Sequence, residues 1–217
     1  DTKKSLIFQF ELSFFITSFF IFYYDVSALT RLFCCDTFLI GGDRMNDKIE
    51  FLKTRSRIRK YQAKQITDKE LETILDVGTY APTAMGKQAP IIVAVQDKET
   101  RDLLSKLNAA VMNGKADPFY GAPTVIVVFG KSDSGCCIQD ASCVMSNLLN
   151  AAHALGLGSC WINRAKEMFE TPEGKELMKK WGIPDNYEGV ANCIVGYIDG
   201  EIPEPKPRKE DYIYIIK

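Results

Sequence analysis

Residues 138–158 read IQDASCVMSNLLNAAHALGLG, and this stretch decides the fold that we expect for the chain. Its first part, 138–155, contains no proline or glycine, and many of its side chains are small and apolar. This pattern predicts a long helix in the centre of the core. Gly156 and Gly158 end that helix, because glycine is favoured just beyond a helix C-terminus, and a strand over 159–162 follows. The glycine pair therefore lies between a helix and a strand, the reverse of the order that a Rossmann dinucleotide site requires.

Outward from this stretch, helices and apolar strands alternate in both directions. Thr67 to Glu70 form a capping box, TDKE, which predicts a helix that begins there and ends before Ala81. The runs 90–96 and 124–129 are continuous apolar segments, which are typical of strands buried on both faces. Such an alternation by itself predicts a doubly wound parallel α/β sheet. The remaining expected elements are helices over 46–54, 98–111 (capped by Asp97) and 172–181, and strands over 190–198 and 212–216.

The composition excludes several classes of protein. With 27 Lys and Arg against 28 Asp and Glu, the formal net charge is -1, so the basic excess of nucleic-acid-binding proteins is missing and we expect no nucleic acid partner. The seven cysteines are odd in number, show no CxxC spacing and accompany a single histidine, which argues against a disulfide framework and against a zinc site. We therefore expect a cytoplasmic protein, with one domain because 217 residues are few for two.

Residues 1–44 differ in character from the rest of the chain. Ser5 to Tyr24 is apolar with one acidic residue and follows two lysines, a pattern that fits a signal peptide or a membrane anchor. However, Gly41-Gly42 stands just before Met45, and such a pair can be encoded by the purine-rich ribosome-binding sequence of a bacterial start site. We expect residues 1–44 to be translated upstream sequence, residues 45–217 to be the working domain, and no membrane partner.

Arg55, Arg57 and Arg59, which we call the arginine cluster, occupy alternate positions of RSRIRKY, residues 55–61. In an extended segment alternate side chains point to the same side, so these guanidinium groups would gather positive charge on one face. Guanidinium binds phosphate oxygens through two parallel hydrogen bonds, and we interpret the segment as a phosphate clamp. The alternative is a solvated run of charge at the end of a helix, because short basic runs are common.

Other side chains with catalytic potential are few. The only histidine, His153, lies in the expected central helix, and we interpret it as structural. Cys160 and Cys193 lie in apolar strands and are expected to be buried, whereas Cys136 and Cys137 are expected to be more exposed. With no metal site and no activated nucleophile in the sequence, an enzyme of this kind would depend on an organic cofactor for its chemistry.

Several separated segments resemble motifs of the nitroreductase family of flavin enzymes. RSRIRKY at 55–61 resembles the family's opening RRSxRxY/F segment, and APTAMGKQAP at 81–90 resembles its APSxxNxQPW loop. The stretch AHALGLGSCW at 152–161 resembles AxxxGLGxxWI. DPFYGAP at 117–123 leads into a strand as in the family, and KPRK at 206–209 resembles its C-terminal KPR.

The resemblance implies an α+β fold with a central, mostly antiparallel sheet flanked by helices, in a homodimer that binds two FMN molecules at its interface. The C-terminal strand 212–216 would cross over and extend the partner's sheet. The 82–84 loop would approach the flavin from the partner subunit, Arg59 would lie by the pyrimidine edge, and backbone amides at 162–164 would bond the ring's reactive nitrogen edge. The implied cofactor-binding residues are Arg55, Ser56, Arg57, Arg59, Pro82, Thr83, Ala84, Gln88, Ile162, Asn163, Arg164, Lys206 and Arg208, and the candidate substrate contacts are Gly86 and Tyr120.

The activity implied by the resemblance is that of an NAD(P)H-dependent oxidoreductase. NADH or NADPH would reduce FMN, and a small acceptor such as a nitroaromatic or a quinone would then take the hydride in a ping-pong reaction. Three departures from the family pattern bear on the site: Arg57 stands in place of serine, Gly86 in place of asparagine, and Ala89-Pro90 in place of Pro-Trp. Two alternatives are a flavin-binding storage or sensing protein without fast turnover, and a membrane-anchored interaction protein.

Overall fold

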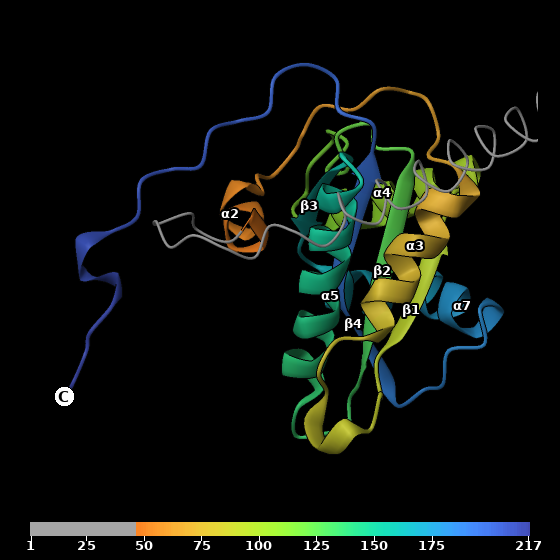
Figure 1. Ribbon diagram of the computed structural model, residues 1–217. Coiled ribbons are helices and arrows are strands. Elements are labelled where there is room, and N and C mark those ends of the chain that lie inside the picture. The colour runs from red at the N-terminus through yellow and green to blue at the C-terminus, as the bar shows by residue number, and fades with distance from the viewer. Residues whose placement is uncertain (1–46) are drawn as a thin grey trace, which may run out of the picture. The chain divides into compact units, whose positions relative to one another are not determined.

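The computed structural model describes residues 47–217, whose helices and strands are shown in Figure 1. The interpretation of residues 1–44 as translated upstream sequence, together with its alternative of a signal peptide or an anchor, lies outside the described residues. Within 47–217 no helix is both long enough and apolar enough to cross a membrane.

A four-stranded sheet forms the centre of the fold. Its strands are β1 (Ile91–Val95), β2 (Thr124–Lys131), β3 (Gly158–Ile162) and β4 (Tyr187–Gly196), in the spatial order β1-β2-β4-β3. Every neighbouring pair is antiparallel. The mostly antiparallel α+β arrangement is therefore confirmed, and the doubly wound parallel sheet that the alternation of elements alone predicts is wrong.

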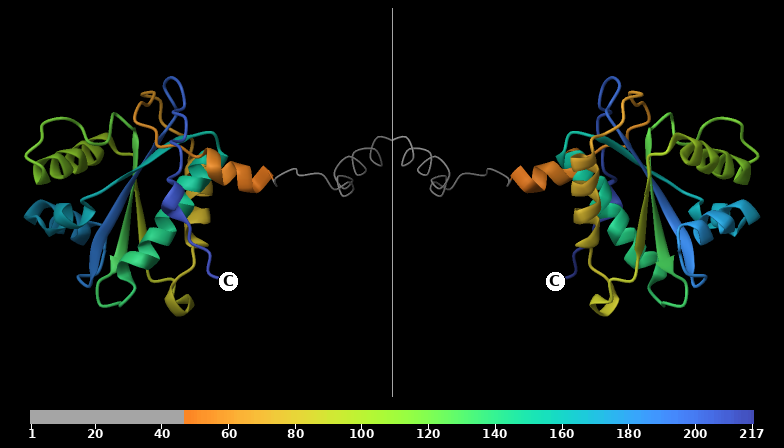
Figure 2. Two further views of the ribbon diagram at one scale, coloured as in Figure 1. Left: turned by 90° about the vertical axis from the view of Figure 1, so that its left-hand side faces the viewer. Right: turned by 90° about the vertical axis from the view of Figure 1, so that its right-hand side faces the viewer.

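Helices cover both faces of the sheet, as the side views of Figure 2 show. One layer consists of α3 (Asp68–Thr79) and α5 (Cys137–Ala154), and the other of α4 (Lys98–Val111), α6 (Ala165–Glu170) and α7 (Pro172–Lys180). The elements outside these layers are α2 (Asp47–Thr54), which buries none of its residues, and the short 3₁₀ helices η1 (Ala84–Gly86) and η2 (Glu210–Tyr212).

The central strand β2 shows how the two layers share one sheet. Val125, Val127 and Phe129 belong to the core under α4, α6 and α7, whereas Ile126 and Val128 belong to the core under α3 and α5. All five side chains are fully buried. The unbroken apolar run of this strand thus reflects two covered faces, which parallel sheets usually have and which this antiparallel sheet has as well.

Local sequence signals set the ends of the helices. Glu70 N donates to Thr67 Oγ1 (3.2 Å) and Thr67 N donates to Glu70 Oε2 (2.8 Å), so the expected capping box of α3 is present. Asp97 Oδ2 accepts from Thr100 N (2.8 Å) and caps α4 as expected. Gly156, with φ of 71°, follows α5 in the left-handed conformation that glycine adopts most easily.

Three elements differ from the expectation. β1 was expected to be fully buried, but it is an edge strand with one neighbour, and four of its five residues are only half-buried. The helix α6 was not expected, because six residues are too few to show a helical period. Residues 212–216 pair with no other strand among the described residues and form no strand there. Their pairing with a partner subunit stays a prediction.

Candidate functional site

The arginine cluster lies in the extended segment 55–61, at the end of the sheet where β3 begins. Ile58 N donates to Ser159 O (3.0 Å), and Tyr61 and Ile198 form a single antiparallel bridge. Ile58 points into the core, while the two arginines that flank it are exposed and the first arginine of the cluster is half-buried. The alternation of an extended segment therefore keeps the three arginines out of the apolar core.

No carboxylate among residues 47–217 lies within ion-pair distance of the arginine cluster. The buried Arg101 provides the contrast, because its guanidinium pairs with Asp117 Oδ2 (2.5 Å) and Asp102 Oδ1 (3.1 Å). The guanidinium of Arg59 lies instead over the ring of Tyr120, 5.3 Å from its centroid. The N–H donors of the cluster are thus available to an anionic ligand, for which guanidinium groups have suitable geometry.

His153 joins α2 to α5 beside the arginine cluster. Its ring stacks on Phe51, with centroids 4.7 Å apart, and its Nε2 lies 3.0 Å from Thr54 Oγ1. Burial, and then the positive charge of Arg55, lower the pKa of His153. These contacts agree with the interpretation of His153 as structural, and they fix the residue that directly precedes the cluster.

In a ¹H NMR titration we expect the ring of His153 to titrate below its usual pKa of about 6.5, because burial disfavours the charged form. The unfolded chain then binds this proton at a higher pH than the folded chain does. The stability of the fold is therefore highest above the pKa of the unfolded chain, and part of it is lost as the pH falls from there to the lower pKa of the folded chain. The chain has one histidine, so the signal is unambiguous. Phe51→Ala should raise the pKa, and a midpoint above the usual value in the parent protein would contradict the assignment.

The loop 81–90 is held at the opposite end of α5. Ala84 N donates to Asp140 Oδ1 (2.9 Å), and Gln88 N donates to Thr83 Oγ1 (2.9 Å). Asp140 is buried in the first turn of α5, and Gln88 has a φ of 50°, which is uncommon for residues other than glycine. Such a conformation persists only where the surroundings hold it, so the loop is fixed where its candidate residues lie.

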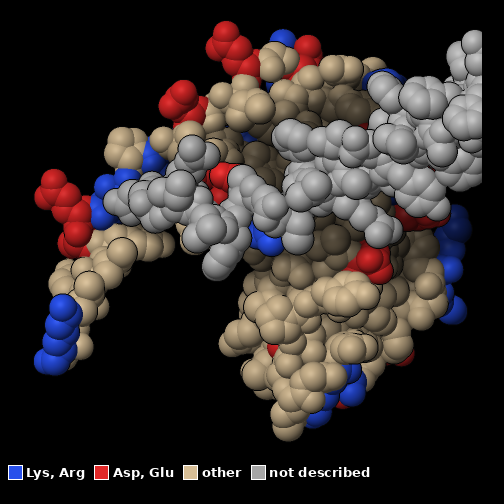
Figure 3. Space-filling view, in the orientation of Figure 1, with Lys and Arg blue, Asp and Glu red and all other residues tan. Residues whose placement is uncertain are grey.

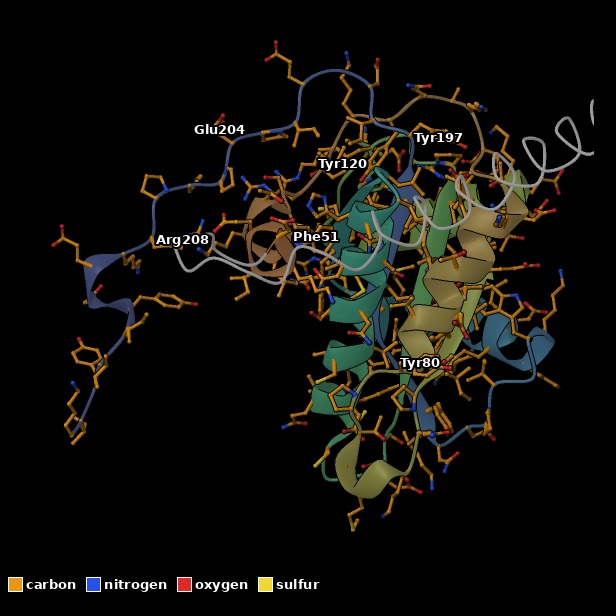
Figure 4. All side chains as sticks on the ribbon, viewed as in Figure 1. Phe51, Tyr80, Tyr120, Tyr197, Glu204 and Arg208 are labelled. Atoms are coloured by element: carbon orange, nitrogen blue, oxygen red, sulfur yellow. The ribbon has the colours of Figure 1, made fainter. Side chains whose placement is uncertain are left out.

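Within one chain, the arginine cluster and this loop are well separated. They are anchored by His153 and Asp140, which lie about 20 Å apart along α5 at the helical rise of about 1.5 Å per residue. Figure 4 shows the same separation, with Tyr120 at one end of the sheet and Tyr80, just before the loop, at the other. The structure thus brings Arg55, Ser56, Arg57, Arg59 and Tyr120 to one end, and places Pro82, Thr83, Ala84, Gly86 and Gln88 at the other.

Residues 162–164 lie where the edge strand β3 ends. Asn108 Nδ2 donates to Asn163 O (2.7 Å), and Asn192 Nδ2 donates to Ile162 O (3.3 Å). The N–H groups of Asn163 and Arg164 have no hydrogen-bond acceptor among residues 47–217. Because β3 starts beside the arginine cluster and ends at these free N–H groups, the two sets of donors lie along one sheet edge, roughly 13 Å apart at about 3.3 Å per residue.

The C-terminal candidates Lys206 and Arg208 lie in an exposed segment that runs away from the sheet (Figure 1). Arg208 Nε donates to Lys206 O (3.1 Å), so this guanidinium folds back on its own segment. No hydrogen bond or ion pair among the described residues joins either side chain to the arginine cluster. The start of the segment does lie there, because Ser56 Oγ donates to Pro203 O (2.5 Å).

Among the cysteines, Cys160 and Cys193 are buried as expected. The expectation of a more exposed Cys137 is wrong, because this thiol is buried at the start of α5 and lies 3.5 Å from Glu188 Oε1. Burial, and then the carboxylate of Glu188, raise the pKa of Cys137 to about 11. A thiol with such a pKa stays protonated at neutral pH and is a poor nucleophile.

Three polar side chains that hold this site were missed from the sequence. Asn108 binds the carbonyl of Asn163, Asp140 anchors the loop, and Asp117 organises the turn that carries Tyr120. A signal for Asn108 was present, since it lies on the apolar face of α4, where a polar residue needs a partner. Asp140 gave a similar signal, because it is a charged residue in a helix whose buried side chains are mostly small and apolar.

Known proteins resemble this chain over most of its described part. A family model, described as "Nitroreductase family", matches residues 52–116 and 108–197. An Archaeoglobus fulgidus protein with the provisional name NADH dehydrogenase/NAD(P)H nitroreductase is 30% identical over 174 residues, which cover 77% of this chain and 91% of the relative. The NADPH-flavin oxidoreductase of Vibrio harveyi is 29% identical over 189 residues, covering 79% and 73%. The crystal structure of a nitroreductase with bound FMN from Bacteroides fragilis has a TM-score of 0.74 at 27% identity, covering 80% of this chain and 100% of that one.

Proposed function

This chain belongs to the nitroreductase family of oxidoreductases, and from that premise we propose that it is an FMN-dependent enzyme that uses NADH or NADPH to reduce small nitroaromatic, quinone or similar acceptors. The observation that carries the proposal is the arginine cluster, which has no carboxylate partner among residues 47–217 and lies on the same sheet edge as two free backbone N–H groups. The FMN bound to the Bacteroides fragilis relative and the activity named for the Vibrio harveyi relative support it.

The donor set fits a flavin nucleotide. Arg55 and Arg57 would hold the phosphate, because guanidinium groups donate to phosphate oxygens and these two lack other anions. Ser56 would join them only after its hydroxyl leaves Pro203 O, to which it donates in this structure. The N–H groups at the end of β3 would bond the reactive edge of the ring, and their role does not depend on side-chain identity. Lys206 and Arg208 would close on the phosphate once the C-terminal segment is docked.

The chemistry that FMN supplies when bound is hydride acceptance from a nicotinamide followed by hydride donation to an acceptor, which predicts ping-pong kinetics. Arg59 would stabilise negative charge at the pyrimidine edge, since a fixed cation is worth more where water is excluded. The 81–90 loop of the partner subunit would cover the ring and orient the acceptor, with the partner subunit's Gly86 and this chain's Tyr120 as contacts. No side chain is assigned as an obligatory acid, because water can deliver protons to a nitro or quinone acceptor.

We further propose that the enzyme is a homodimer whose sites contain residues of both subunits. Two observations support this: one chain holds the arginine cluster and the 81–90 loop about 20 Å apart, and large apolar side chains are exposed around the loop. Tyr80, Met85 and Ile138 are 78%, 83% and 61% exposed. Figure 3 shows few charged side chains over this end of α5, as a surface that packs against a second copy requires.

The test is the visible absorbance spectrum of the purified protein, before and after anaerobic addition of NADH or NADPH. We expect a yellow protein whose flavin bands bleach within seconds and return when a nitroaromatic or quinone is added. A yellow protein that does not bleach would favour the storage or sensing alternative. A protein that stays colourless after incubation with FMN would contradict the proposal at its central observation, the arginine cluster.

A further inference from the structure

Tyr120 has an unusual backbone and an unusual neighbour. Its φ of 54° lies in the left-handed region, which bulky residues seldom occupy, and the residue is 40% exposed. The ring nevertheless lies under the guanidinium of Arg59, 5.3 Å from centroid to Cζ, which is within the range of a cation–π interaction. An uncommon conformation that is kept at a candidate site points to a role for the side chain that it directs.

The turn that carries Tyr120 is fixed by the carboxylate of Asp117. Gly121 N (2.7 Å) and Phe119 N (2.9 Å) donate to it from either side of Tyr120. Arg101 Nη2 (2.5 Å) and Ser105 Oγ (2.6 Å) donate to the same carboxylate from α4. These four donors on one carboxylate hold the backbone on both sides of Tyr120, so the fold sets the point from which its ring extends.

We propose that Tyr120 is a positioning residue for Arg59, in addition to any contact with substrate; this rests on the proposed FMN function. The ring covers one face of an exposed guanidinium that has no carboxylate partner among the described residues, and it leaves the N–H edge free. A long, unpaired side chain otherwise samples many rotamers and must lose that freedom when a ligand binds. By covering one face of the guanidinium, the ring restricts Arg59 before the ligand binds, so less of that freedom is left to lose.

The test compares Tyr120→Gly with Tyr120→Phe in the full chain. Glycine adopts a φ of this kind without strain, so Tyr120→Gly removes the ring and keeps the turn. We expect Tyr120→Gly to weaken FMN binding about two- to five-fold, the usual strength of an exposed cation–π pair, and to make the reduction potential of the bound flavin more negative. Tyr120→Phe keeps the ring face and should restore both values. Circular dichroism and thermal unfolding check that the fold is retained.

A double-mutant cycle separates positioning from a structural role. If Tyr120 acts through Arg59, then adding Tyr120→Gly to Arg59→Ala changes FMN affinity and potential no further. Equal effects of Tyr120→Gly with and without Arg59 would overturn the inference, and so would a Tyr120→Gly protein whose affinity and potential match the parent. A parent protein that does not bind FMN would overturn the proposed function, and with it this inference. Riboflavin should lose as much affinity as FMN, because the contact is placed at the ring and not at the phosphate.

Discussion

Replacing Arg55 with alanine is expected to weaken FMN binding by about two orders of magnitude. The half-buried Arg55 has no carboxylate partner among residues 47–217, so its N–H donors are available to the phosphate. Hydrogen bonds to charged groups contribute about 1.5–3 kcal/mol each. Loss of a bidentate contact, about 3 kcal/mol, corresponds to roughly 150-fold in the dissociation constant at 1.4 kcal/mol per tenfold. Fluorescence titration of the apoprotein with FMN measures it.

Lys60→Ala provides the matched control for Arg55→Ala. It removes the same charge from the same segment, but Lys60 is 75% exposed and pairs with Asp199 (3.1 Å), so FMN binding should change little. Riboflavin lacks the phosphate, and its affinity should be similar in Arg55→Ala and in the parent. If Arg55→Ala and Lys60→Ala weakened FMN equally, the effect would come from net charge alone, and the phosphate contact would have to be abandoned.

Removing residues 204–217 is expected to abolish both the dimer and tight FMN binding. The segment ends in five large apolar side chains that are 74% or more exposed: Tyr212, Ile213, Tyr214, Ile215 and Ile216. Full burial of such a side chain contributes roughly 1.5–3 kcal/mol, and an extended apolar segment of this kind is usually covered by another strand. Light scattering gives the mass, and the absorbance ratio of flavin to protein gives the occupancy.

Two variants separate the roles of this segment. Lys206→Ala with Arg208→Ala keeps the apolar end, so it should stay dimeric and lose FMN affinity. Removal of 212–217 alone keeps both cations, so it should lose the dimer first. A flavin-loaded dimer that lacks residues 204–217 would show that the segment is dispensable, and would refute both the crossover and the role of the two cations.

Local features of the fold could be predicted from the sequence because neighbouring residues determine them. The capping box at Thr67 and Glu70, the cap at Asp97 and the glycine after α5 each act within a few residues. Strand direction was not readable in this way. The apolar run of β2 records that both of its faces are covered, and only the family resemblance indicated that its neighbours are antiparallel.

In the candidate site, too, only the features that neighbouring residues determine could be predicted from the sequence. Alternate spacing predicted an arginine cluster on one side of an extended segment, but whether carboxylates neutralise it depends on residues distant in sequence. Arg101 is neutralised by Asp117 and the cluster is not. The bond between Asn108 and Asn163, like the anchor between Ala84 and Asp140, joins segments that only the folded chain brings together.

The position of β4 in the sheet has a consequence for the order of folding. β4 lies between β2 and β3, and β3 pairs with no other strand of the sheet. The consecutive strands β1 and β2 can therefore pair early, whereas β3 joins the sheet only through residues 187–196. A folding intermediate that lacks β4 leaves the apolar edge of β2 unpaired, and unpaired strand edges of this kind make such intermediates prone to aggregation.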